Sequence, residues 1–338
     1  MPKERKTIIL AIDTSCDDTS AAVISGEDFN MLSNIVSSQS EIHRKYGGIV
    51  PELASRRHME LIWPVVNEAL STAEITLSAL NAISVCYGPG LIGSLIVGSS
   101  FAKALAYAAS KPLIGVNHLE GHMFSPFLSK EERPTFPFIC LIVSGGHTSL
   151  YRVEGFARYS ELGRTRDDAV GEAYDKVAKM LGLSYPGGPI IDSLAKKGNA
   201  SAIKFPRPFL NGSLDFSFSG LKTAVRSFIA AKEFQAVTLE DVCASFQESV
   251  IDVLLKKVDD VIKMEKIYSL VLAGGVAANS LLRQKMTALS QAAGFSLFLP
   301  PLKLCTDNAA MIAVAGYFYY QEGLFANMNL TPKAYLPL

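Results

Sequence analysis

Short apolar runs alternate along the chain with longer segments in which apolar residues recur at helical spacing. The apolar runs end at small or polar residues and cover residues 7–12, 21–25, 82–87, 111–116, 137–143, 267–273 and 295–299. Runs of this length predict strands, whereas the segment 93–110 and the segments after residues 277 and 307 predict helices. The alternation predicts an α/β fold with ligands beside the glycine-rich turns at strand ends.

Residues 12–20 and 141–149 align without gaps, which indicates an internal repeat. Both stretches read as an apolar strand, a turn of small or polar residues, a Thr-Ser pair and a second strand. Nine positions can also match by chance, so duplication is one of two interpretations. Under duplication we expect a first lobe over residues 1–133 and a second over 134–338, with a cleft between them. The more helical stretch 159–263 then reads as an insertion, and the final helix is free to pack back on the first lobe.

The composition predicts a large core. The chain has 338 residues, of which 49% are hydrophobic and only 19% charged, below the usual quarter or so. The formal net charge is zero, which argues against a surface coated in positive charge for nonspecific nucleic-acid binding but allows a local basic patch. Five dispersed cysteines without a C-x-x-C pair predict reduced thiols in a cytoplasmic protein.

Nothing in the hydropathy pattern predicts a membrane segment. The first apolar run is short and meets Asp13, so it does not read as a signal peptide. The longest apolar helical segment, 93–110, carries Lys103 and several Gly and Ser residues. We therefore expect a core helix there and no association with membrane.

Two histidines four residues apart, His118 and His122, are the strongest candidates for chemistry. On a helix this spacing places both imidazoles on one face, where they can share a metal ion. A zinc protease of the H-E-x-x-H class needs a Glu directly after the first His. Leu119 holds that place, and Glu120 lies about 200° around the helix from His118, at roughly 100° per residue. The pair therefore predicts a metal site of another class, with Glu120 in a structural role.

Asp307 is a candidate third ligand for this pair. One interpretation is a helix start, with Thr306 as N-cap and Asp307 favoured by the helix dipole. The other is a carboxylate that completes a set of two histidines and one acid. Such a set suits Fe(II) or Zn(II) and leaves coordination positions open for substrate.

Three glycine-containing turns follow predicted strands, at residues 88–90, 144–147 and 274–275. Exposed N–H groups and the positive end of a helix dipole favour phosphate at such turns. Each turn alone is better explained by a tight change of direction from strand to helix. The three together favour a nucleotide-like ligand.

Carboxylates gather at the first hairpin turn, in Asp13, Asp17 and Asp18. They form either a solvent-facing turn or a site that binds a second cation, or orients a phosphate or a nucleophile. Asp175 reads as a helical surface residue, and the rigid turn 185–189 that follows indicates a fixed ligand wall. Scattered basic pairs read as solvated faces unless several of them share one groove.

Together these motifs resemble the TsaD family, the tRNA N6-adenosine threonylcarbamoyltransferases once described as O-sialoglycoprotein endopeptidases. The resemblance runs in order along nearly the whole chain, through residues 13–19, 88–91, 118–122, 143–148, 171–176, 185–189, 218–223, 274–279 and 305–308. One departure is that Asp13 and Asp18 stand where many members have Glu. Each carboxylate is one methylene shorter, which leaves the roles of these two residues open.

The resemblance implies an activity and an architecture. The family has the duplicated actin/Hsp70/sugar-kinase (ASKHA) fold, an α/β fold of two lobes with a cleft between them. It transfers the threonylcarbamoyl group from threonylcarbamoyl-AMP to N6 of the adenosine 3′ of the anticodon, position 37, in tRNAs that read codons beginning with A.

Carried over by position, the resemblance also implies site residues. His118, His122 and Asp307 would hold one divalent metal, Fe(II) first, with Zn(II) or Mg(II) as alternatives. The adenylate contacts would be Ile142, Val143, Ser144, Gly145, Gly146, Asp175, Gly188, Asp192 and Asn279. No side chain is an obvious general base, so we expect positioning to dominate, with help from a first-turn aspartate.

The implied partners are tRNA, threonylcarbamoyl-AMP, a shorter inactive paralogue (TsaB) and a small P-loop ATPase (TsaE). An ATP-dependent phosphotransferase or ATPase of the same fold is the alternative function, and it would turn over ATP without tRNA. A metalloprotease is disfavoured by Leu119. A non-enzymatic scaffold would be expected to lack the histidine pair.

Overall fold

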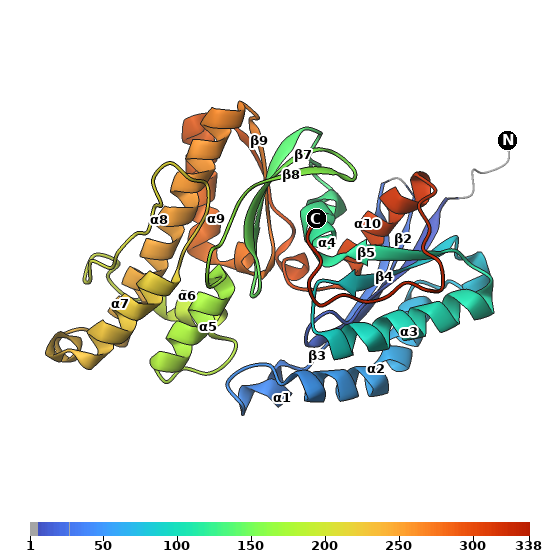
Figure 1. Ribbon diagram of the computed structural model, residues 1–338, viewed down its shortest axis with the longest axis horizontal. Helices are drawn as coiled ribbons and strands as arrows, with labels where there is room; N and C mark the ends of the chain where they lie inside the picture. The colour runs from blue at the N-terminus through green and yellow to red at the C-terminus, as the bar shows by residue number, and fades with distance from the viewer. Residues whose placement is uncertain (1–5, 27) are drawn as a thin grey trace. The chain divides into compact units, whose positions relative to one another are not determined.

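The computed structural model describes residues 6–26 and 28–338. Within them the chain forms two compact units, one from residues up to 133 together with 300–338, the other from residues 134–299. Residues 300–338 thus return to the first unit, and the second unit lies within one continuous stretch of chain (Figure 1). Each unit is built on its own five-stranded sheet.

The first unit has the strand order β3-β2-β1-β4-β5. Its strands are β1 (Ile8–Asp13), β2 (Asp18–Ser25), β3 (Asn30–Ser38), β4 (Ala82–Gly88) and β5 (Leu113–Asn117). The first three strands are antiparallel, and β4 and β5 join β1 in parallel. β1 lies at the centre, where all but its first residue is buried. That burial explains its continuous apolar sequence.

The first unit contains five α-helices in the described chain. They are α1 (Ser40–Arg44), α2 (Pro51–Thr72), α3 (Ile92–Ala109), α4 (His118–Phe124) and α10 (Ala309–Gln321). Leu10 and Ile12 of β1 belong to the core that α2 and α3 complete. Ile9 points the other way, because alternate residues of a strand face opposite sides, and it lies by Gly316 of α10.

Helix α3 is long and apolar enough to span a membrane on length and composition alone, and 33% of it is buried. A core helix of a soluble fold passes the same test. Its buried residues Leu95 and Ala102 pack inside the first unit, as the sequence predicts for a core helix.

The second unit has the strand order β10-β9-β6-β7-β8. Its strands are β6 (Phe138–Val143), β7 (Thr148–Gly155), β8 (Arg158–Arg164), β9 (Ser269–Ala273) and β10 (Ser296–Phe298). Its helices are α5 (Val170–Met180), α6 (Gly187–Ala195), α7 (Ser219–Ala230), α8 (Leu239–Glu265) and α9 (Ser280–Ala293). The stretch 159–263 therefore begins with strand β8 before it becomes helical.

The two sheets repeat one plan, which confirms the duplication. An antiparallel hairpin, β1–β2 or β6–β7, is joined on its first strand by a parallel strand, β4 or β9. The registers agree as well. Asp13 pairs with Ser20, and Ile142 pairs with Ser149, which are the same positions of the gapless repeat in the sequence.

Two predicted helix starts are wrong. The helix expected from residue 277 begins only at Ser280, because a short 3₁₀ turn, Gly275–Ala278, comes first and Asn279 is the N-cap. The final helix is capped by Asn308, whose side chain accepts the Met311 N–H, and not by Thr306. The other predicted elements agree with the structure to within a few residues.

Candidate functional site

Helix α4 begins with a capping box that determines where its side chains point. The Asn117 side chain accepts the Leu119 N–H at 2.9 Å, and the Glu120 carboxylate accepts the Asn117 N–H at 3.4 Å. Glu120 also accepts the Tyr319 hydroxyl of α10 at 2.9 Å. The Glu120 carboxylate therefore stabilises the start of α4 and its packing against α10.

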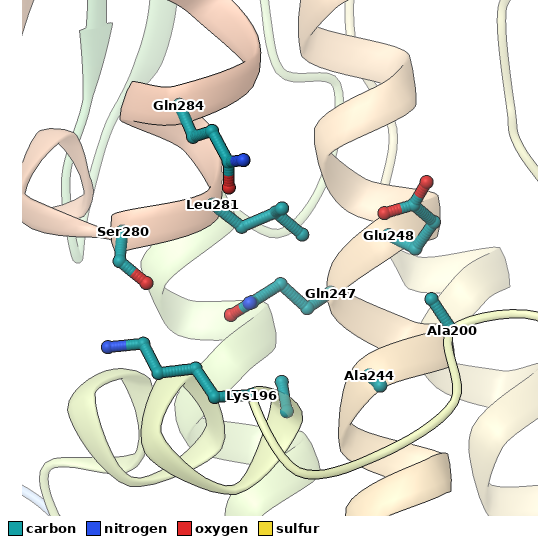
Figure 2. Close-up of a pocket in the computed structure, with 9 residues that line it drawn as sticks. Lys196, Ala200, Ala244, Gln247, Glu248, Ser280, Leu281 and Gln284 are labelled. Carbon is teal, nitrogen blue, oxygen red and sulfur yellow. The ribbon is translucent and has the colours of Figure 1, made fainter.

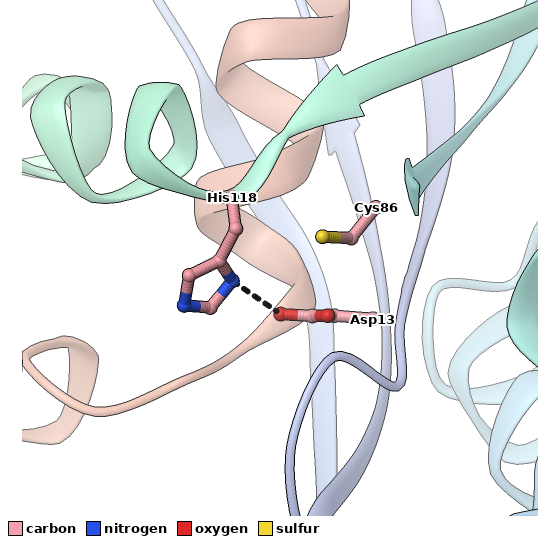
Figure 3. A group of neighbouring side chains, drawn as sticks. All are labelled: Asp13, Cys86 and His118. Atoms are coloured by element: carbon pink, nitrogen blue, oxygen red, sulfur yellow. Dashed lines mark ion pairs between the residues drawn. The ribbon is translucent and has the colours of Figure 1, made fainter. Parts of the chain in front are cut away.

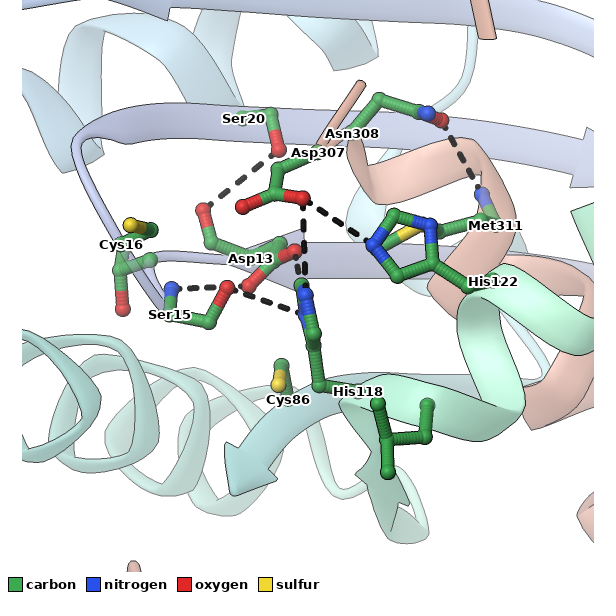
Figure 4. A network of polar contacts seen from close by, with 12 residues as sticks. Asp13, Ser15, Cys16, Ser20, Cys86, His118, His122, Asp307, Asn308 and Met311 are labelled. Atoms are coloured by element: carbon green, nitrogen blue, oxygen red, sulfur yellow. Dashed lines mark hydrogen bonds and ion pairs between the residues drawn. The ribbon is translucent and has the colours of Figure 1, made fainter. Parts of the chain in front are cut away.

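The face of α4 that carries the histidines meets Asp307 (Figure 4). His122 Nε2 lies 3.2 Å and His118 Nε2 lies 3.5 Å from the same oxygen, Oδ1 of Asp307. The two rings are 4.7 Å apart at their centroids and nearly perpendicular. Because Asn308 caps α10, the side chain of Asp307 is directed at the histidines and does not cap the helix. The structure thus brings the three predicted ligands together.

The pKa values of His118, His122 and Asp307 depend on one another. Burial alone lowers the pKa of His118, but the Asp307 carboxylate and then the Asp13 carboxylate raise it well above its usual value. Burial tends to raise the pKa of Asp307, yet the two imidazoles hold it well below the usual range. Burial lowers the pKa of His122. Without other ligands, the charged forms of His118 and Asp307 therefore stabilise each other.

A divalent metal fits these residues on the evidence of unused donors. His122 is buried, and its Nε2 makes no well-directed hydrogen bond within residues 6–26 and 28–338, although Oδ1 of Asp307 lies 3.2 Å away. A buried polar atom without a partner is costly, and a metal ion would satisfy it. His118, His122 and Asp307 can each offer one ligand atom, all within 4.8 Å of one another.

The second nitrogen of His118 faces a different set of groups (Figure 3). Its Nδ1 lies 3.1 Å from the Ser15 hydroxyl and 3.6 Å from Oδ2 of Asp13. The other oxygen of Asp13 accepts the Ser15 N–H at 2.9 Å. Cys86 completes this second cluster, but burial raises the pKa of its thiol to about 11, which keeps it protonated and a poor ligand. Asp13 thus lies behind His118, where it can orient the ring.

Of the first-turn aspartates, Asp13 is buried and Asp17 and Asp18 are half-buried, so these carboxylates face solvent only in part. Burial, reinforced by Asp307, raises the pKa of Asp17. Burial also raises the pKa of Asp18, to about 7. The turn is held by His58, whose ring nitrogens lie 2.7 Å from the Thr19 hydroxyl and 3.0 Å from the Cys16 carbonyl oxygen.

In the second unit, two of the predicted glycine turns lie side by side. The Ser144 N–H donates to the His147 carbonyl at 2.8 Å, which closes the turn after β6. A Cβ on Gly274, after the neighbouring strand β9, would lie 2.4 Å from the Val143 carbonyl oxygen. Gly145 and Gly146 are exposed and have open space where a Cβ would be. Their main chain is therefore accessible at the carboxyl end of two parallel strands, where phosphate groups bind in such folds.

The other polar residues predicted to contact the adenylate, Asp175, Asp192 and Asn279, make hydrogen bonds within the protein. Asp175 accepts the Gly187 N–H at 2.7 Å, which ties α5 to α6 beside the open Gly188. Asp192 accepts the Ser280 hydroxyl at 2.9 Å. The Asn279 side chain caps α9.

A buried amide connects these last residues to a cavity. Gln247 of α8 donates to Asp192 at 3.2 Å and accepts from the Asn279 side chain at 2.7 Å. Beside it lies a cavity of about 470 Å³ between α6, α8 and α9, lined by Lys196, Gln247, Ser280 and neighbours (Figure 2). Gln247 and Ser280 carry no motif in the sequence. Only the packing of α8 against α6 and α9 reveals them.

The turn at residues 88–90 differs from the other two. The Gly90 N–H, which we expected to face an anion, donates to the Ala334 carbonyl at 3.2 Å. The chain itself covers this turn.

Comparison with known proteins shows to which family the chain belongs. The family model TsaD, described as tRNA N6-adenosine threonylcarbamoyltransferase, matches residues 30–314. The chain belongs to this family. A relative of the same description from Thermodesulfovibrio yellowstonii is 58% identical over 336 residues, covering 98% of this chain and 100% of the relative. One from Clostridium perfringens is 50% identical over 337 residues, covering 98% of each chain.

Solved structures of distant proteins share the fold. The T. kodakarensis HypF structure matches with a TM-score of 0.63 at 14% identity, covering 96% of this chain and 49% of that one. Component A of the (R)-2-hydroxyglutaryl-CoA dehydratase of Acidaminococcus fermentans matches with a TM-score of 0.54 at 13% identity, covering 94% and 98%. The predicted ASKHA-type α/β fold is confirmed.

Proposed function

We propose that this protein transfers the threonylcarbamoyl group of threonylcarbamoyl-AMP to N6 of adenosine 37 in tRNAs that read codons beginning with A. Membership of the TsaD family supports this reaction. The structural observation that carries the proposal is the cluster of the buried His118 and His122 with the half-buried Asp307, in which two imidazole nitrogens converge on one carboxylate oxygen.

One divalent metal is held by His118, His122 and Asp307 in this proposal, with Fe(II) favoured over Zn(II) and Mg(II). Two nitrogens and one carboxylate oxygen suit Fe(II) and leave positions for substrate oxygens. The metal supplies Lewis-acid polarisation of a substrate oxygen.

The second unit binds the adenylate part of the donor. The main chain of Ile142 to Gly146 meets its phosphate, since the exposed Gly145 and Gly146 leave N–H groups within reach. Asp175, Gly188, Asp192 and Asn279 contact the rest of the adenylate in this proposal. Their bonds to Gly187, Gln247 and Ser280 are support that holds them rigid for binding.

In the transfer step the exocyclic amine of adenosine attacks the carbamoyl carbon. The bond from that carbon to the phosphate oxygen breaks, AMP leaves with the electron pair, and the amine loses one proton. Asp17 or Asp18 accepts that proton in this proposal. The raised pKa of each carboxyl group, caused by burial, makes it a better proton acceptor than an exposed aspartate.

The partners are tRNA, a TsaB-type paralogue and a TsaE-type ATPase, all in the cytoplasm. An apolar surface on α2 and α3 supports binding of a protein partner. Its exposed side chains are Met59, Trp63, Ile92 and Ile96. Met59 and Trp63 are four residues apart on α2, as are Ile92 and Ile96 on α3, and large exposed apolar side chains on one helix face are typical of protein interfaces. Trp63→Glu with Ile96→Glu should abolish co-elution with the paralogue, whereas the exposed Met264→Glu in the second unit should not.

A nucleotide-dependent phosphotransferase remains the second function, because the ASKHA fold also houses such enzymes. It predicts ATP turnover by the isolated protein without tRNA. A metalloprotease has less support, since Glu120 is engaged with Asn117 and Tyr319.

The test is reconstitution of the modification. The protein is incubated with unmodified tRNA, threonine, bicarbonate, ATP, the enzyme that makes the adenylate, and the two partners. Mass spectrometry of the nucleosides should detect threonylcarbamoyladenosine with the wild type and with the surface control Glu233→Gln. It should detect none with His118→Ala plus His122→Ala. Absence from the wild type, or persistence in the double variant, would overturn the proposed mechanism.

A further inference from the structure

The segment 326–336 crosses the end of the first sheet that carries the metal-binding helix. We propose that its residues 333–336 are a positioning element of the metal centre, holding the start of α4 through Asn117 and thereby placing His118. This inference rests on the proposed metal site. It assigns a role to main-chain atoms far from that site in the sequence.

The segment is first attached to β5. The Ala326 N–H donates to the Leu113 carbonyl at 2.8 Å. Leu330 then packs on Gly115, where a Cβ would lie 3.0 Å from the nearest methyl of Leu330. The strand that leads into α4 is thus covered by this segment along its length.

The segment next closes over the end of β4. The Lys333 N–H donates to the Tyr87 carbonyl at 2.8 Å, and the Ala334 carbonyl accepts the Gly90 N–H. Gly88 has φ +154°, and a Cβ there would lie 2.3 Å from the Lys333 carbonyl oxygen. A side chain at Gly88 would therefore push the segment away, which makes this glycine part of the same attachment.

The last contact reaches the metal-binding helix itself. The Asn117 side chain donates through Nδ2 to the Leu336 carbonyl at 3.1 Å, and through Oδ1 it accepts the Leu119 N–H. One amide thus joins the segment to the first turn of α4. His118, the first residue of that helix, follows directly. Both ends of the amide are fixed, so the orientation of the helix start is fixed with it.

A purely structural segment and a positioning segment predict different results. If the segment only adds stability, its removal lowers the melting temperature and leaves metal affinity at low temperature unchanged. If it positions His118, its removal weakens metal binding in protein that is still folded. Groups that orient metal ligands from outside the first coordination sphere typically contribute roughly 10- to 100-fold in affinity.

The experiment measures Zn(II) affinity of metal-free full-length chain and of variants by chelator competition, with circular dichroism to verify folding. Removal of residues 333–338 should raise the dissociation constant roughly 10- to 100-fold. Removal of residues 337–338 is the matched control, because it keeps the Leu336 acceptor, and it should change nothing. The absorption spectrum of bound Co(II) should also change in the longer truncation only.

A point variant keeps the test decisive if the long truncation unfolds. Asn117→Asp retains an acceptor for the Leu119 N–H but loses the donor to Leu336. It should weaken Zn(II) binding about tenfold, and Asn117→Ala should weaken it further. Wild-type affinity in Asn117→Asp would overturn the inference. If His118→Ala plus His122→Ala binds Zn(II) as tightly as the wild type, the proposed metal site fails instead.

Discussion

The two hairpin turns, one in each unit, share a register and differ in chemistry. In the first unit, Cys16 and Asp17 lie where the second unit has Gly145 and Gly146. The first turn presents half-buried carboxylates that interact with Asp307, and the second presents an open main chain. The same hairpin backbone therefore presents carboxylate side chains in the first unit and main-chain N–H groups in the second. The difference is made by side chains at equivalent positions.

The turns also differ in how their surroundings satisfy polar groups. Around the first turn, Oδ2 of Asp13, Oδ1 of Asp18 and both nitrogens of His122 are buried without hydrogen bonds in the described chain. In the second unit, Asp175 and Asp192 accept hydrogen bonds from the protein. The first cluster is costly unless a cation completes it, whereas the second is stable before its ligand arrives.

The largest effect should come from the carboxylate that completes the first cluster. Asp307→Asn keeps the shape of the side chain but removes the negative charge that both imidazoles face. We expect modification of tRNA to fall by at least about 100-fold and metal affinity to fall with it. Single-turnover assays and chelator competition measure the two quantities. Full activity in this variant would remove Asp307 from the site.

The next effect concerns the backbone of the second turn. Gly274→Ala should destabilise the protein by about 2–3 kcal/mol, because Gly274 has φ +94° and its Cβ would collide with the Val143 carbonyl. Gly146→Ala, where a Cβ meets open space, is the matched control and should cost less than about 0.5 kcal/mol. Denaturant unfolding compares the two, and equal losses would contradict the geometry.

The carboxylates of the first turn predict a pH dependence. The pKa of Asp18 is about 7 in the folded chain, against an ordinary value of 3.8, because burial disfavours the charged form. A raised pKa means that the stabilisation is complete below about pH 4 and is lost as the pH rises through 7. Asp18→Asn, which stays neutral, should match the metal-free wild type at pH 4 and exceed its stability at pH 8, by at most about 4 kcal/mol because solvent screens this half-buried group. Parallel stability curves for the two proteins would show that Asp18 does not titrate in this range.

The smallest effect separates the scaffold of α4 from its metal ligands. Tyr319→Phe removes the hydroxyl that donates to Glu120. We expect a loss of about 1 kcal/mol in stability and no change in metal affinity, since Glu120 faces away from the histidines. Thermal unfolding and chelator competition provide the comparison. A large fall in metal affinity would mean that Glu120 takes part in the site.

Much of the fold follows from local sequence. Buried strands such as β1 and β6 are continuous apolar runs, and the gapless repeat anticipates the common register of the hairpins. Helix starts are less certain, because Thr306 and Asn308 are both good N-cap residues and only packing selects between them. Before α9 the chain takes a positive φ at Gly274 and then a 3₁₀ turn, neither of which hydrophobic periodicity predicts.

Some residues of the site can likewise be predicted from local sequence, and others cannot. His118 and His122 are recognisable because four-residue spacing has a direct meaning on a helix. Gln247 cannot be recognised from the sequence, because its role depends on contacts with Asp192 and Asn279, which are far away in the chain. The segment 333–336 has no signature either, because it acts through main-chain carbonyls that any residue provides.

The central claim is that His118, His122 and Asp307 hold the metal on which transfer depends. The most direct measurement titrates metal-stripped protein with Fe(II), without oxygen, and follows threonylcarbamoyladenosine formed in a single turnover with partners and tRNA present. Product should rise in proportion to Fe(II) and level off at one equivalent per chain, and the His122→Ala protein should show no such rise. Full transfer by stripped protein, or an unchanged titration with His122→Ala, would contradict the account.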